Sequence, residues 1–268
     1  MKSSQSGPET ILDRIVEKKR EEIKLSKLEI PLLKLEQSEF FTRECFSLRD
    51  FILNPARTGI IAEFKRKSPS KGIINDKLSV QEVTNGYAEA GASALSVLTD
   101  ESFFGGNNLD LIAARKANTI PVLRKDFMLD EFQVIEAKAL GADIILLIAS
   151  ILNPKEIKNL AKLAKSLGMN VLLEVHNLDE LNRSLCEDLD AVGVNNRNLG
   201  DFSVSIQHSF DLVDHIPSQF LKISESGISD PKKIADLKIA GFNGFLIGEN
   251  FMKEVDPGKA MKEFVAQL

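Results

Sequence analysis

The chain has 268 residues, an ordinary globular composition and a formal net charge of −5 at pH 7. This charge argues against nucleic acid as a partner, because nucleic-acid-binding domains generally carry a basic patch or stripe. The two cysteines, Cys45 and Cys186, lie far apart and show neither a disulfide framework nor metal-ligand spacing, as expected in a reduced cytoplasm.

The amino-terminal segment predicts a helix rather than a targeting signal. The first ten residues lack the apolar core of a signal peptide, and no apolar run reaches the ~18 residues needed to span a bilayer, so we expect a cytoplasmic protein with no membrane contact. From residue 11 to about residue 27, apolar residues recur on one helical face. They are Ile11, Leu12, Ile15, Val16 and Ile23. We interpret K-K-R at 18–20 as a solvated helix face rather than a basic patch, because E-E follows it.

Eight short apolar runs follow, each typical of a parallel strand buried on both faces. They cover residues 60–64, 94–98, 121–123, 144–148, 171–175, 191–194, 221–223 and 244–247. Helix-like segments lie between them, and Gly-containing junctions such as L-G-A-D precede several strands. Eight such units predict a single α/β domain folded as a (β/α)8 TIM barrel of roughly 250 residues, with an open doubly wound sheet as the alternative. We expect residues 1–55 to form an N-terminal helical extension packed on a barrel of residues 56–268.

Charged residues gather where these strands end. In the first strand Glu63 and Lys65 share a face with Ile61, because strand side chains alternate. If this were the only such strand, we would interpret the two residues as a solvent-exposed ion pair. Similar groups end several other strands, however, and in a barrel the carboxyl ends of the strands converge on one mouth. Lysines beside carboxylates in a partly dry mouth are suited to general acid–base chemistry.

The last two strand ends indicate a phosphate site. S-E-S-G-I at 224–228 and G-F-L-I-G-E-N at 244–250 provide small residues and backbone N–H groups after strands seven and eight, where barrels usually bind phosphate. Tight turns and helix caps are the alternative interpretation. We therefore expect a small-molecule substrate with a phosphate group.

Seven motifs in order along the chain resemble the indole-3-glycerol-phosphate synthase family. They are A-E-F-K-R-K-S-P-S-K-G (62–72), L-R-K-D-F (123–127), G-A-D-I-I-L-L-I (141–148), L-L-E-V-H (172–176), G-V-N-N-R-N-L (193–199), S-E-S-G-I (224–228) and F-L-I-G-E (245–249). The resemblance implies a TIM barrel and a carboxy-lyase of tryptophan biosynthesis. Its reaction converts 1-(2-carboxyphenylamino)-1-deoxyribulose 5-phosphate to indole-3-glycerol phosphate by ring closure, decarboxylation and dehydration, with no cofactor and no metal.

The resemblance also implies roles for particular residues. Lys125 resembles the general acid and Glu174 the base, while Lys65, oriented by Glu63, assists closure or dehydration. The division of proton transfers between Lys65 and Lys125 stays open. Asn195 resembles a ligand of the sugar hydroxyls.

Other residues resemble the substrate-binding wall of the family. Arg197 resembles a conformation-setting or substrate-carboxylate contact. Phe127 is expected to face the aromatic ring, and Leu146 and Leu246 to belong to the pocket, with simple core packing as the alternative for Phe127 and Leu146. The expected phosphate ligands are Ser68, Ser226, Gly227, Gly248 and Glu249. A carboxylate repels phosphate, so Glu249 is expected to offer only its backbone N–H.

Two loops rich in Gly, Ser, Asn and charged residues follow the first two predicted strands. Residues 65–77 and 101–108 are interpreted as mobile covers of the mouth, with a hydrophobic staple as the alternative for E-S-F-F-G-G at 101–106. One rival function is an isomerase of a phosphorylated sugar amine, and the other is an inactive barrel kept as a scaffold. The presence of both Lys125 and Glu174 argues against the scaffold. We expect a monomer, with loose association with other tryptophan-pathway enzymes left open.

Overall fold

A closed barrel of eight parallel strands forms the centre of the computed structural model, which describes residues 10–198, 200 and 202–268. The strands are β1 (Ile60–Phe64), β4 (Ala94–Leu98), β5 (Val122–Lys125), β6 (Ile144–Ile148), β7 (Asn170–Val175), β8 (Ala191–Asn195), β9 (Leu221–Glu225) and β10 (Gly244–Ile247). Their order around the barrel is β1-β10-β9-β8-β7-β6-β5-β4. The TIM-barrel prediction is confirmed and the open sheet is excluded. The expected strands differ from the observed ones by no more than two residues at an end.

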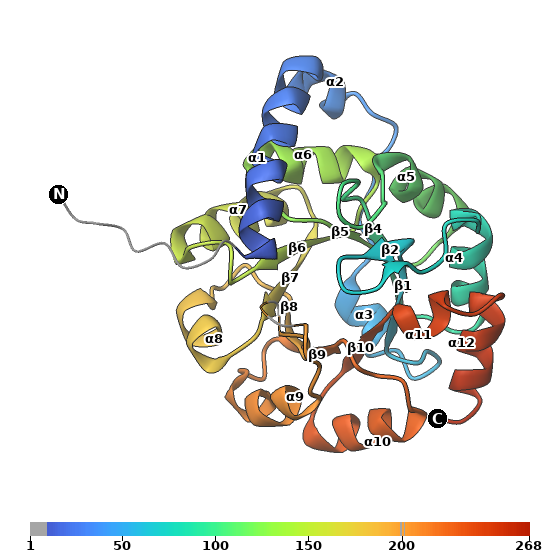
Figure 1. Cartoon of the computed structure of the whole chain (residues 1–268). Helices are drawn as coiled ribbons and strands as arrows, with labels where there is room; N and C mark the ends of the chain where they lie inside the picture. Colours follow the sequence, from blue (N-terminus) through green and yellow to red (C-terminus); the bar gives the residue numbers. More distant parts are fainter. Residues whose placement is uncertain (1–9, 199, 201) are drawn as a thin grey trace.

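Helices surround the ring of strands (Figure 1). They are α4 (Val80–Glu89), α5 (Asn108–Ala117), α6 (Glu131–Leu140), α7 (Pro154–Ser166), α8 (Leu178–Ser184), α9 (Gln207–Leu212), α10 (Pro231–Ala240), α11 (Glu249–Met252) and α12 (Pro257–Val265), with a 3-10 turn η1 (Val213–His215). Two of the Gly junctions end helices in the left-handed conformation that glycine adopts readily, at Gly141 (φ 93°) and Gly241 (φ 108°). Each junction turns the chain directly into the next strand.

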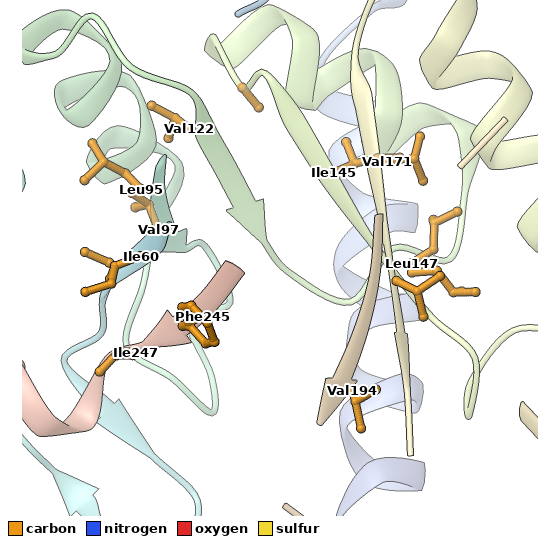
Figure 2. Packing of buried hydrophobic residues seen from close by; sticks show 14 of the residues in the cluster. Ile60, Leu95, Val97, Val122, Ile145, Leu147, Val171, Val194, Phe245 and Ile247 are labelled. Carbon is orange, nitrogen blue, oxygen red and sulfur yellow. The ribbon is translucent and has the colours of Figure 1, made fainter. Parts of the chain in front are cut away.

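Alternation along the strands divides the core into two layers. Ile60, Val97 and Phe245 belong to the layer between the strands and the surrounding helices (Figure 2). Ile61 and Leu123 belong to the barrel interior. Buried residues on both faces explain why the strands read as continuous apolar runs.

Three helices precede the barrel: α1 (Ile11–Glu29), α2 (Leu32–Glu36) and α3 (Leu48–Ile52). The helix predicted from residue 11 is present and extends two residues beyond the expected end, whereas α2 and α3 were not expected. Leu48 and Ile52 of α3 are buried in the interior layer with the inward side chains of the strands. Residues 1–9 of the expected extension, and Leu199 at the end of one motif, lie outside the described residues.

The interpretation of K-K-R as a solvated face is wrong for Lys19. Its side chain is 5% exposed, and its Nζ lies 3.0 Å from Asp100 Oδ2 and 2.9 Å from Asp126 Oδ1. Burial lowers the pKa of Lys19, but the carboxylates of Asp126 and Asp100 outweigh it, so the pKa lies above its usual value. Lys19 therefore joins α1 to the ends of β4 and β5 by a buried ion pair.

Candidate active site

Two adjoining pockets open at the carboxyl ends of the strands, and every residue predicted for the site lines at least one of them. The larger group lines the first pocket: Glu63, Lys65, Ser68, Lys125, Phe127, Leu146, Glu174, Asn195, Arg197, Ser226, Leu246 and Glu249. Gly227 and Gly248 line the second pocket, which shares Lys65, Arg197 and Ser226 with the first. The structure thus brings all fourteen predicted residues to one mouth.

Strand alternation decides which charged side chains enter this mouth. β5 ends in three consecutive charged residues, but Arg124 lies on the outer face, where its Nη2 is 2.7 Å from Glu136 Oε2. Asp126 lies at the edge of the first pocket, where its carboxylate is turned toward Lys19 and pairs with it. Only Lys125 continues the inward series that begins with Leu123.

Lys125 lies between two buried carboxylates. Its Nζ is 2.7 Å from Glu174 Oε2 and 3.2 Å from Glu225 Oε2. Burial lowers the pKa of Lys125, but Glu174 and Glu225 raise it further, so the amine is held in its charged form. Burial would raise the pKa of Glu174, yet Lys125 and His176 lower it to about 2.

Glu225 differs from Glu174 although both bind the same amine. Burial and the nearby Glu174 carboxylate raise the pKa of Glu225 to about 7 against the opposing effect of Lys125. Its Oε1 is buried and has no hydrogen bond within the described part of the chain. Sequence reasoning omitted Glu225 from the site, because S-E-S-G-I was interpreted as a phosphate motif. The inward series Leu221, Ile223, Glu225 was the signal that could have found it.

A second pair lies on β1. Lys65 Nζ is 2.7 Å from Glu63 Oε1, and the hydroxyl of Ser96 donates to Glu63 Oε2 at 3.3 Å. Asn195 Nδ2 donates to Glu174 Oε1 at 3.1 Å. Lys65 and Lys125 therefore each have a carboxylate partner within 2.7 Å that orients the amine.

Two inward glycines make room for the carboxylates. A Cβ at Gly193 would lie 2.0 Å from Glu225 Oε1, and one at Gly248 would lie 2.7 Å from Glu63 Oε1. Both distances are far below van der Waals contact. Gly193 of β8 and Gly248 after β10 therefore leave open the space that these two carboxylates occupy.

One wall of the first pocket is apolar. Phe127, Phe104 and Leu146 line it, and the rings of Phe104 and Phe127 are 5.9 Å apart in a tilted arrangement. Ile11, Leu12 and Ile15 of α1 complete the wall. The amphipathic face of α1 was predicted, but its place at the mouth was not, since helical periodicity does not identify what a face contacts.

The opposite wall, shared with the second pocket, is polar. Ser226 (φ 68°) and Gly227 (φ 74°) both have left-handed backbones, and Asn196 Nδ2 holds the Ser226 carbonyl at 3.1 Å. A serine in this conformation is uncommon, and such strain concentrates at functional sites. The Glu249 carboxylate lies 3.5 Å from Arg197 Nη2 and 3.7 Å from Lys71 Nζ, so two cations offset its charge.

The fold and the mouth define a class of protein: a TIM-barrel enzyme with paired lysines and carboxylates for acid–base chemistry between an apolar and a polar wall. The family model for indole-3-glycerol phosphate synthase matches residues 12–264. The chain belongs to the indole-3-glycerol phosphate synthase family.

Curated relatives agree over almost the full length. An indole-3-glycerol phosphate synthase of Bacteroides thetaiotaomicron is 44% identical and the match covers 96% of this chain and 98% of the relative. One from Carboxydothermus hydrogenoformans is 40% identical, with 95% and 99% covered. Among solved structures, 3-hexulose-6-phosphate synthase from Salmonella typhimurium has a TM-score of 0.60 at 17% identity, covering 78% of this chain and 99% of that one. That likeness shows the barrel fold alone.

Within the described residues, no group of three or more His, Cys, Asp or Glu side chains could hold a metal ion. No helix of the same residues is long and apolar enough to cross a membrane.

Proposed function

We propose that this chain closes the ring of 1-(2-carboxyphenylamino)-1-deoxyribulose 5-phosphate, with loss of carbon dioxide and water, to form indole-3-glycerol phosphate in tryptophan biosynthesis. Membership of the family supports this carbon–carbon lyase activity. The observation that carries the proposal is Lys125, held by Glu174 and Glu225 where the apolar and polar walls meet.

The two walls match the two ends of this substrate. The aromatic ring would lie against Phe127, Phe104 and Leu146, which form the apolar side. The phosphate would bind near Ser226 and Gly227 on the other side, with Ser68, Gly248 and the backbone of Glu249 around it. Binding both ends folds the open-chain sugar so that the carbonyl carbon meets the ring, and such positioning supplies a large part of catalysis.

The proton transfers follow from the pairs around the mouth. Lys125 would protonate the carbonyl oxygen as the ring carbon attacks the carbonyl carbon. Carbon dioxide then leaves from that ring carbon. Glu174 would act as the base that removes a proton during dehydration. Lys65, oriented by Glu63 at 2.7 Å, would assist closure or the loss of water.

Asn195 and Arg197 complete the proposed contacts. Asn195 lies beside Glu174 and would bind the sugar hydroxyls while orienting that carboxylate. Arg197 lines both pockets and would contact the substrate carboxylate or set the bound conformation. In the free protein its guanidinium lies 3.5 Å from Glu249, so substrate binding would exchange one anionic partner for another.

Product fluorescence tests the proposal directly. The chain has no Trp and one Tyr, so indole emission would rise over a very low protein background. Purified protein mixed with the carboxyphenylamino deoxyribulose phosphate is expected to give a saturable rise. Folded protein that binds the substrate without any rise would favour the scaffold, and no binding would favour another phosphate-binding barrel.

The Lys125→Ala variant tests whether the proposed general acid is needed for turnover but not for folding. Loss of the general acid is expected to lower kcat by about 100-fold or more. Circular dichroism should show a folded barrel. Substantial remaining turnover would assign the acid to another group, foremost Lys65.

We also propose a monomer, in which a single chain would form both pockets. Size-exclusion chromatography with light scattering tests this, and a stable dimer would contradict it. A cytoplasmic location and loose association with other enzymes of tryptophan biosynthesis stay proposals.

A further inference from the structure

His176 follows β7 directly and lies behind the pocket wall rather than in it. Its backbone N–H donates to Glu180 Oε2 at 2.8 Å, and its Nδ1 lies 3.2 Å from the same oxygen. Glu180 belongs to the first turn of α8. These contacts turn the ring so that Nε2 lies 3.5 Å from Glu174 Oε1.

The two carboxylates that bind Lys125 therefore have unequal surroundings. Glu174 Oε1 has the Asn195 amide at 3.1 Å and the His176 ring at 3.5 Å, in addition to the Lys125 contact of Oε2. Glu225 has Lys125 at 3.2 Å on Oε2, while its buried Oε1 has no hydrogen bond within the described residues. A carboxylate whose oxygen receives no hydrogen bond is less stabilised in its charged form, which favours the proton on Glu225 rather than on Glu174.

When two carboxylates share a buried site, the pKa of one of them is raised and the two titrate as a coupled pair. Here burial and the Glu174 carboxylate raise the pKa of Glu225 to about 7. A charged group close to one of the two carboxylates determines which of them carries the proton. We propose that His176 is a positioning residue whose charge keeps this proton on Glu225 and so leaves Glu174 ionised. This inference rests on the proposed function in one respect, namely that Glu174 acts as the base.

The charges around His176 support this assignment. The carboxylates of Glu180, Glu174 and Glu225 face the imidazole, and Lys125 lies on the far side of Glu174. Burial lowers the pKa of His176, but its hydrogen bond to Glu180 and the charge of Glu174 raise it above the usual value. A neutral ring would direct a lone pair at one of these carboxylates, at Glu174 from Nε2 or at Glu180 from Nδ1, and either contact is repulsive. The imidazolium is therefore the favoured form.

The first experiment measures kcat and KM of His176→Gln from pH 6 to pH 9. Gln retains a donor but no charge, so at pH 6 most of the population should carry the proton on Glu174 and kcat should fall by about tenfold, with a smaller loss at pH 7. KM should stay within about twofold, since His176 does not line the pockets. Above pH 8 both carboxylates ionise, and the loss should shrink. An equal loss at every pH, or no loss, would overturn the proposal.

Two controls sharpen the result. His215→Gln changes an exposed histidine of η1 and should leave the whole profile unchanged. Glu225→Gln removes the competing carboxyl, so in that background His176→Gln should cost less than about threefold. A full tenfold loss in the double variant would show that His176 acts without Glu225.

A readout without substrate keeps this inference separate from the proposed activity. The chain has three histidines, so nitrogen-15 NMR of the rings can be assigned by single substitutions. At pH 7 the His176 ring should carry protons on both nitrogens in the free protein. A singly protonated ring would refute the proposal even if the wild type closes the substrate ring, and a doubly protonated ring would support it even if the wild type does not.

Discussion

Ser226 combines an uncommon backbone conformation with a place in both pockets. Its φ of 68° is one that Asp and Asn adopt more easily than most residues. Aspartate can therefore be introduced here with little backbone cost, which makes this position suitable for a test of charge.

Ser226→Asp is expected to raise KM for the phosphorylated substrate by about tenfold or more, because a carboxylate would repel the phosphate. Ser226→Asn is the matched neutral control and should affect KM much less. Steady-state fluorescence kinetics would measure both. An unchanged KM in the Asp variant would place the phosphate elsewhere.

Glu225 links the site to the pH dependence of stability. Its pKa is about 7 in the folded protein and near the ordinary glutamate value in the unfolded chain, so between these values the folded state holds a proton that the unfolded state has released. Stability therefore falls as pH rises through this window.

Glu225→Gln should remove this loss of folding stability with rising pH. Urea unfolding at pH 5.5 and pH 8 is expected to show the wild type losing about 2 kcal/mol more than the variant over this range. The comparison between the two proteins cancels titrations that they share. A parallel change in both proteins would show that Glu225 is already ionised at pH 5.5.

At the scale of elements, α1 is joined to the barrel by charge as well as by apolar contact. Lys19 is paired with Asp100 and Asp126, which follow β4 and β5, and Ile11 and Ile15 of the same helix line the first pocket. The position of this helix should therefore affect both stability and substrate binding.

Lys19→Met is expected to lower the free energy of unfolding by about 3 kcal/mol, because it leaves two buried carboxylates without their shared cation. KM should rise as well if α1 shifts at the mouth. Lys18→Met removes an exposed pair with Glu21 and should cost less than about 1 kcal/mol. Urea unfolding of both variants tests the difference, and equal losses would contradict a buried anchor.

The division at residue 55 stays a prediction. Leu48 and Ile52 of α3 belong to the interior layer with Ile61 and Ile223 of the strands. These contacts lead us to propose that the N-terminal segment folds together with the barrel.

Across the whole molecule, the barrel was predictable because its signal repeats. Eight apolar runs with Gly junctions are compatible with few folds other than this barrel. By contrast, α2 and α3 have only five residues each and are too short to show a helical period. Much of the site was also predictable, because the carboxyl ends of all eight strands of a TIM barrel meet at one mouth whatever side chains they carry.

Contacts between distant segments were not predictable. The pairing of Lys19 with Asp126 joins residues far apart in sequence, and the direction of the His176 ring depends on Glu180 in the next helix. A strand pattern shows which face a side chain occupies but not which partner it meets. Glu225 shows this limit: alternation alone places it inward, but does not identify Lys125 as its partner.

The room left by Gly193 and Gly248 has a consequence for how this family can vary. Any side chain at either position would displace the carboxylate of Glu225 or Glu63 from its present place, so a change there also changes the position of its acid. Glycine and carboxylate are thus epistatic partners: each limits the substitutions open to the other. Routes by which such a barrel could evolve another activity would have to change both members of a pair.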